Sequence, residues 1–174
     1  MQQSISDVRT ADGLSANGNR VLVKLCPGGS WEVKSLAELL SIKVAFKVIS
    51  WTGELFRTAD AYAYSGGVVT SETYRVKISG IPYDCAPGHP WLVLKRGRAE
   101  LVDTALLKPG VLVIRHPGLV GTTFSTLKKF GTGVVSSVKR RSEPTLVGNL
   151  SVHNQGNFML DTGCMTGSKR KQAE

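Results

Sequence analysis

The sequence predicts an all-β fold in a single domain. Short runs of β-branched and aromatic residues recur along 174 residues, and most of them end at one of the 19 glycines or 7 prolines. Turn residues spaced regularly between short apolar runs are typical of sandwiches and barrels. The chain contains no internal repeat and no low-complexity linker, so we expect one domain with one core.

The individual elements follow from the pattern in order. The first 14 residues are polar and predict a flexible lead-in. Residues 73–78 alternate strictly between two faces, which is a clear strand signal. Ser35 before Leu36–Leu40 predicts a short capped helix, and residues 102–107 predict a second one. We expect strands over residues 21–25, 31–34, 43–51, 55–64, 73–78, 91–94, 111–114, 133–139, 145–152 and 157–160.

The formal net charge is +9, and much of it lies in basic clusters at residues 128–129, 139–141 and 169–171. Such clusters can mark a nucleic-acid-binding surface. A basic β module that binds nucleic acid without catalysis is therefore the alternative function. No aromatic residue is interleaved with the clusters for base stacking, so we do not expect a nucleic-acid partner.

No apolar run is long enough to cross a membrane, and no signal-peptide pattern opens the chain. We therefore expect a cytoplasmic protein with no membrane partner. The three cysteines, Cys26, Cys85 and Cys164, match no zinc or redox spacing, so neither a metal nor a cofactor is expected. Cys85 has two interpretations, a buried apolar residue or a thiol near a site, whereas Cys164 is predicted to be structural.

One histidine, His89, follows a turn at Pro87–Gly88 and precedes an apolar strand. An imidazole titrates near neutral pH, so it can protonate a leaving group or polarise a carbonyl. The ordinary interpretation is that His89 only bonds a carbonyl of its turn. Trp91 is predicted to be a core residue that flanks His89, and His116 and His153 are predicted to lie on the surface or in loops.

Several segments occur in an informative order: residues 15–23, 80–93, 105–113, 146–152 and 156–160. The first begins with Ser15, a hydroxyl nucleophile, followed by a glycine three residues later and then a strand. The second contains His89 before proline and an aromatic–aliphatic run. The last contains Asn157–Phe158. This order resembles the motifs of the intein family, within the hedgehog/intein autoprocessing domains.

The resemblance implies a horseshoe-like, all-β domain with pseudo-two-fold symmetry and one or two short helices. The intein-like part spans residues 15–168, which leaves no room for a homing endonuclease, so the domain is of the minimal kind. Residues 1–14 and 169–174 are then flanking, extein-like segments. They are the expected partners, and a complementary split fragment is the other partner that the family uses.

The resemblance also implies a self-processing reaction without a cofactor. Ser15 Oγ attacks the Leu14 carbonyl in an N–O acyl shift, and His89 protonates the departing amide nitrogen of Ser15. Ala86 stands where the family has a threonine that supports the scissile bond. Losing such a donor typically costs on the order of 100- to 1000-fold in rate. Backbone N–H groups near Gly88 are expected to compensate in part.

At the other end, the family closes on His-Asn, followed by a nucleophile. This chain has Gly167, Ser168 and Lys169 there. A serine cannot cyclise as asparagine does, so we expect a precursor trapped before cleavage at this junction. Asn149 and Thr166 are candidates for orienting it. A second register ends on Asn154, within Val152-His153-Asn154, and leaves the last strand outside the domain.

Overall fold

The computed structural model describes residues 12–63, 66–123 and 128–168. The elements are β1 (Leu14–Ser15), β2 (Arg20–Val23), β3 (Glu32–Ser35), α2 (Leu36–Leu40), β4 (Phe46–Trp51), β5 (Phe56–Ala63), β6 (Val68–Thr70), β7 (Thr73–Ile78), β8 (Ile81–Cys85), β9 (Pro90–Lys95), β10 (Arg98–Asp103), the 3-10 helix η1 (Thr104–Leu106), β11 (Leu112–Arg115), β12 (Gly131–Arg141), β13 (Thr145–Gly148), β14 (Leu150–Val152), β15 (Asn157–Met159) and β16 (Met165–Gly167). Strands dominate the described residues, and the predicted all-β class is confirmed.

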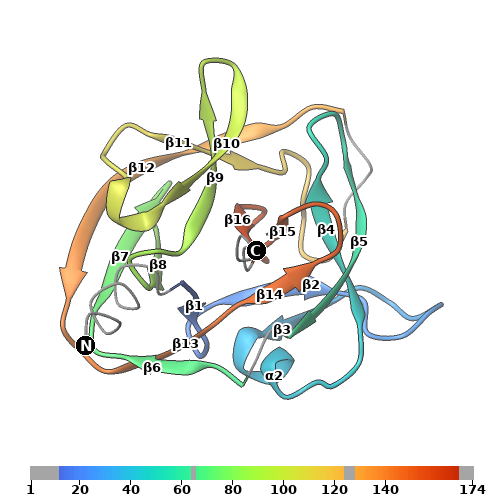
Figure 1. Ribbon diagram of the computed structural model, residues 1–174. Coiled ribbons are helices and arrows are strands. Elements are labelled where there is room, and N and C mark those ends of the chain that lie inside the picture. The colour runs from blue at the N-terminus through green and yellow to red at the C-terminus, as the bar shows by residue number, and fades with distance from the viewer. Residues whose placement is uncertain (1–11, 64–65, 124–127, 169–174) are drawn as a thin grey trace.

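Three sheets build the domain. The largest has the strand order β15-β16-β9-β11-β12-β7-β8-β1-β13-β6, with β10 paired to β9. A three-stranded sheet has the order β14-β5-β4, and β2 pairs with β3. Figure 1 shows β15 and β16 in the middle of the molecule, with the other strands arranged around them. The first and last strands therefore both lie inside one sheet, and the strands between them include β8 and β9, whose connecting turn carries His89.

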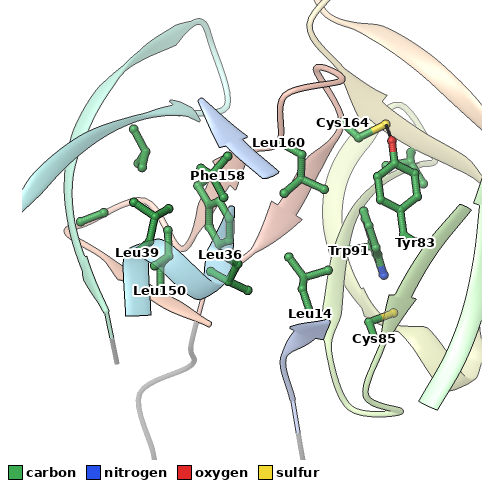
Figure 2. Packing of buried hydrophobic residues seen from close by; sticks show 14 of the residues in the cluster. Leu14, Leu36, Leu39, Tyr83, Cys85, Trp91, Leu150, Phe158, Leu160 and Cys164 are labelled. Atoms are coloured by element: carbon green, nitrogen blue, oxygen red, sulfur yellow. Dashed lines mark hydrogen bonds between the residues drawn. The ribbon is translucent and has the colours of Figure 1, made fainter. Parts of the chain in front are cut away.

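The core explains why the first strand is fixed. Leu14 is fully buried, and Figure 2 shows it between Leu36 and Leu39 on one side and Trp91 and Cys85 on the other. Burying a leucine side chain stabilises the fold by about 1.5–3 kcal/mol. The prediction of a flexible lead-in is therefore wrong for residues 12–14, which are packed. Residues 1–11 lie outside the described part of the chain.

Several predicted elements differ from the observed ones. The helix expected over residues 102–107 is wrong, because β10 continues to Asp103 and only Thr104–Leu106 form a 3-10 turn. The strand expected over residues 145–152 is two strands, because the chain changes sheets at Asn149. Strands β1, β6, β8, β10 and β16 were not expected. The short helix α2 is confirmed, and Ser35 caps it by accepting a hydrogen bond from Glu38 N.

No described helix is both long enough and apolar enough to cross a membrane.

Candidate functional site

The turn between β8 and β9 carries His89 into the interior, where its side chain is fully buried. His89 N donates to Ala86 O at 3.1 Å, which closes the turn predicted at Pro87–Gly88. The β8 strand before this turn is held by a bidentate ion pair, in which Arg75 donates to Asp84 at 2.9 and 3.0 Å. A bidentate pair of this kind fixes geometry as well as charge.

One imidazole connects the first and last strands. Gly13 N donates to Nδ1 of His89 at 3.2 Å, and Nε2 of His89 lies 2.5 Å from Thr166 Oγ1. A backbone amide can only donate, so Nδ1 is the acceptor and the proton of the neutral ring is on Nε2. Thr166 accepts that proton and donates its own to Pro90 O at 3.2 Å. This chain of hydrogen bonds fixes both the ring and its tautomer.

Gly13 fits its place because it has no side chain. Its φ of +135° lies in a region that L residues rarely adopt. A Cβ at this position would lie 3.0 Å from Gly148 N and 3.1 Å from Val147 Cβ. Gly13 O accepts a hydrogen bond from Ala86 N at 2.8 Å. The turn that carries His89 therefore bonds both the N–H group and the carbonyl oxygen of Gly13.

Thr104, which the sequence analysis missed, holds the backbone of His89. Its N and its Oγ1 both donate to His89 O, at 2.9 and 2.7 Å. Oγ1 also accepts from Trp91 Nε1 at 3.1 Å and lies 3.2 Å from the Cys85 thiol. Thr104 stands at the start of a 3-10 turn far from His89 in sequence, and no local pattern marks it. The Trp91 ring flanks His89, with ring centroids 5.8 Å apart.

Ser15 lies on the same strand but does not face His89. It pairs with Val147 of β13, and a Cβ on Gly18 would lie 3.2 Å from Ser15 Oγ. Two residues of a strand span roughly 6.6 Å, so a ring bonded to Gly13 N does not bond Ser15 N in the same arrangement. The amide that His89 bonds in this structure belongs to Gly13, and the expected action of His89 on the Ser15 amide stays a prediction.

The last described residues reach the site from the other side. Thr166 pairs with Trp91, and Gly167 lies against Pro90, so both are adjacent to the His89 backbone. Ser168 is buried, and its N donates to Gly156 O at 3.0 Å. Lys169 lies outside the described residues. By contrast, His153 and Asn154 of the second register are exposed in a turn, and β15 and β16 follow them into the interior.

Asn149 is buried at the point where the chain leaves one sheet for another. Its Oδ1 accepts from Leu150 N at 2.8 Å, and its buried Nδ2 has no partner among the described residues. It follows Gly148, which contacts Gly13. Asn149 therefore lies on the N-terminal side of the site, beside β1. The expected role in orienting the C-terminal junction stays a prediction.

The buried thiols of Cys85 and Cys164 are not activated as nucleophiles. Burial raises the pKa of Cys85 to about 12, so its thiol is protonated at neutral pH. Burial also raises the pKa of Cys164, whose sulfur accepts a hydrogen bond from Tyr83 at 3.5 Å (Figure 2). His116 lies in the loop after β11, one of its two predicted places, but it is buried against Phe56, so the surface alternative is wrong. The described residues contain no cluster of three or more groups that could hold a metal.

No family model matches the sequence, and no curated protein does either. The three-dimensional structure, in contrast, is similar to many solved structures. A DnaB intein from Synechocystis sp. PCC 6803 has a TM-score of 0.62 at 15% identity, covering 92% of this chain and 100% of its own.

Two further structures show the same similarity. An intein-like domain from Clostridium thermocellum has a TM-score of 0.63 at 20% identity, covering 90% of this chain and 99% of its own. The Mvu mini-intein of transcription factor IIB has a TM-score of 0.66 at 14% identity, with the same coverage. This chain therefore has the all-β fold of the inteins.

Proposed function

We propose that this chain is an autoprocessing domain of the mini-intein type, which breaks a peptide bond of its own first strand with His89 as the general acid. One observation carries the proposal. A buried imidazole bonds the backbone amide of Gly13, directly before β1, through Nδ1 and a side chain of β16 through Nε2. An imidazole held on a peptide nitrogen is placed to protonate that nitrogen as it leaves.

The bond that this geometry favours is Asp12–Gly13, because its nitrogen lies 3.2 Å from Nδ1. This separation is at the long end of the range for proton transfer between heavy atoms. The N–O acyl shift from Leu14 to Ser15, expected from the sequence, is the competing reaction. In both reactions the partners are the flanking segments of the chain. β1 and β16 both belong to this chain, which supports the flanking segments as its partners.

The test is to incubate the purified full chain and to identify its fragments by intact-mass spectrometry. A fragment that begins at Gly13 or at Ser15 supports the proposal. His89→Gln is expected to lower the rate of its formation by about 100-fold or more. Thr166→Val keeps the ring but removes the partner of Nε2, so a smaller decrease is expected. A His89→Gln chain that remains folded and cleaves at the wild-type rate contradicts the proposal.

At the C-terminal junction we propose that the reaction stops, because Ser168 has no side-chain amide to cyclise. Residues 169–174 then stay attached in every product. Ser168→Asn is expected to release them as a separate mass, while Ser168→Ala, the control, retains them. If Ser168→Asn also retains residues 169–174 while the N-terminal fragment forms, Ser168 does not occupy the position of the family's terminal asparagine.

A further inference from the structure

The peptide bond that faces His89 has no nucleophile on its C-terminal side. Gly13 has no side chain, and its φ of +135° and its contact with Gly148 leave no room for one. An acyl shift onto residue 13 is therefore impossible in this chain. If the Asp12–Gly13 bond breaks, the attacking group has to come from another residue or from water.

We infer that the attacking group is the side-chain carboxylate of Asp12, so that the chain cleaves itself on the N-terminal side of Gly13. This inference rests on the proposed function and specifies its nucleophile. The carboxylate of an aspartate closes a five-membered ring onto its own main-chain carbonyl carbon, which requires no other residue. An intramolecular attack of this kind has a large effective concentration.

The reaction balances with water as the only co-reactant. One Oδ of Asp12 forms a bond to the carbonyl carbon of Asp12, and the bond from that carbon to Gly13 N breaks. The nitrogen takes a proton from Nδ1 of His89, which the ring has acquired from solvent. The products are a cyclic anhydride at Asp12 and a new amino terminus at Gly13. Water then opens the anhydride to two carboxyl groups. Asp12 is only partly buried, which leaves room for that water.

The hydrogen bonds around His89 favour this leaving group. In the resting state Nδ1 accepts from Gly13 N, as described above. Once Nδ1 is protonated, two N–H donors face each other, which disfavours the planar amide. A pyramidal nitrogen offers a lone pair to the same proton, so protonated His89 binds the transition state better than the ground state. Ala86 N keeps Gly13 in place through Gly13 O, 2.8 Å away.

Ser15 is less well placed to supply the nucleophile for this bond. Its Oγ lies beside Gly18, and its carbonyl oxygen accepts from Asn19 Nδ2 at 2.9 Å. These contacts hold Ser15, the last residue of β1, against the turn that follows it. The side chain of Asp12, in contrast, is attached to the Cα next to the acyl carbon, so its carboxylate reaches that carbon by closing a five-membered ring.

The experiment compares Asp12→Ala with Asp7→Ala in the full chain, because both variants remove one carboxylate from the N-terminal segment. The chains are incubated with and without hydroxylamine, and the fragments are sequenced by tandem mass spectrometry. We expect Asp12→Ala to lose about 100-fold or more of the rate at which the Gly13 fragment forms, while Asp7→Ala cleaves like wild type. Hydroxylamine is expected to trap the anhydride as a hydroxamate on the side chain of Asp12.

The other outcomes separate this inference from the proposed function. If Asp12→Ala still forms the Gly13 fragment at the wild-type rate, water is the nucleophile, and the inference fails while the proposed function stands. A fragment that begins at Ser15 also overturns the inference and leaves the proposed function standing. A mass loss of one water without cleavage means that Gly13 N attacked the carboxyl group, which overturns the inference. If no fragment forms and no hydroxamate is trapped, both the inference and the proposed function fail.

Discussion

In the proposed register Gly167 stands where the family has a histidine, and its surroundings favour glycine for a steric reason. A Cβ at position 167 would overlap Pro90 Cγ, and it would lie 2.9 Å from Pro90 Cβ and 3.1 Å from Leu101 Cδ2. Pro90 directly follows His89, so it cannot move without moving the turn. The histidine that the family has at this position would therefore not fit here unless β9 shifted.

We predict that Gly167→Ala destabilises the fold by about 1–3 kcal/mol, the usual cost of overpacking a filled core. The free energy of unfolding is measured by urea denaturation. Gly66→Ala is the matched control, because nothing lies within 4 Å of a Cβ at position 66. Equal unfolding midpoints for the two variants would mean that β16 and β9 can separate at little cost.

Single residues of the site could be predicted only in part. His89 and Trp91 were found from the sequence, because the turn residues before them and the apolar run after them are local signals. Gly13 was missed because its role depends on a positive φ and on the close approach of Gly148, which lies far away in sequence. Thr104 was missed for the same reason, since its partners come from β8, the His89 turn and β9.

At the scale of elements, the strands whose own residues alternate between apolar and polar were predicted. Strands that form only because neighbouring strands pair with them were not. β7 alternates along its own sequence, and it was found. β8 contains Pro82, and its sequence predicts a turn. In the structure Tyr83 and Cys85 point into the core and fix the pairing of β8 with β7. β16 has only three residues, all buried, and its position is determined by β9 and β15 on either side.

The break between β13 and β14 is also set by a contact that sequence patterns do not reveal. Residues 145–152 read as one strand because they are apolar on average. Asn149 interrupts that strand, since its Oδ1 accepts from the next backbone amide, Leu150 N. A side chain that bonds its neighbouring backbone competes with the ladder of a sheet. The chain then joins a different sheet, in which β14 pairs with β5.

At the scale of the whole molecule, Asn157 holds two sheets together. Trp51 N donates to Asn157 Oδ1 at 2.8 Å, and Asn157 Nδ2 donates to Trp51 O at 3.0 Å. Ser50 Oγ also donates to Asn157 O. Trp51 ends β4 in the three-stranded sheet, and Asn157 begins β15 in the largest sheet. The amide side chain therefore pairs with Trp51 as a neighbouring strand would, and it positions β15, which in turn pairs with β16 of the site.

We therefore predict that Asn157→Asp destabilises the whole domain by at least about 2 kcal/mol, because a carboxylate cannot donate to Trp51 O and is buried without compensation. Asn154→Asp is the matched control. Asn154 is exposed, and its φ of +65° is a conformation that aspartate tolerates. Urea unfolding is followed by tryptophan fluorescence and by far-UV circular dichroism. If the two sheets depend on this contact, both signals of Asn157→Asp shift together to lower urea. A shift confined to one signal, or none relative to Asn154→Asp, would show that the sheets are held together elsewhere.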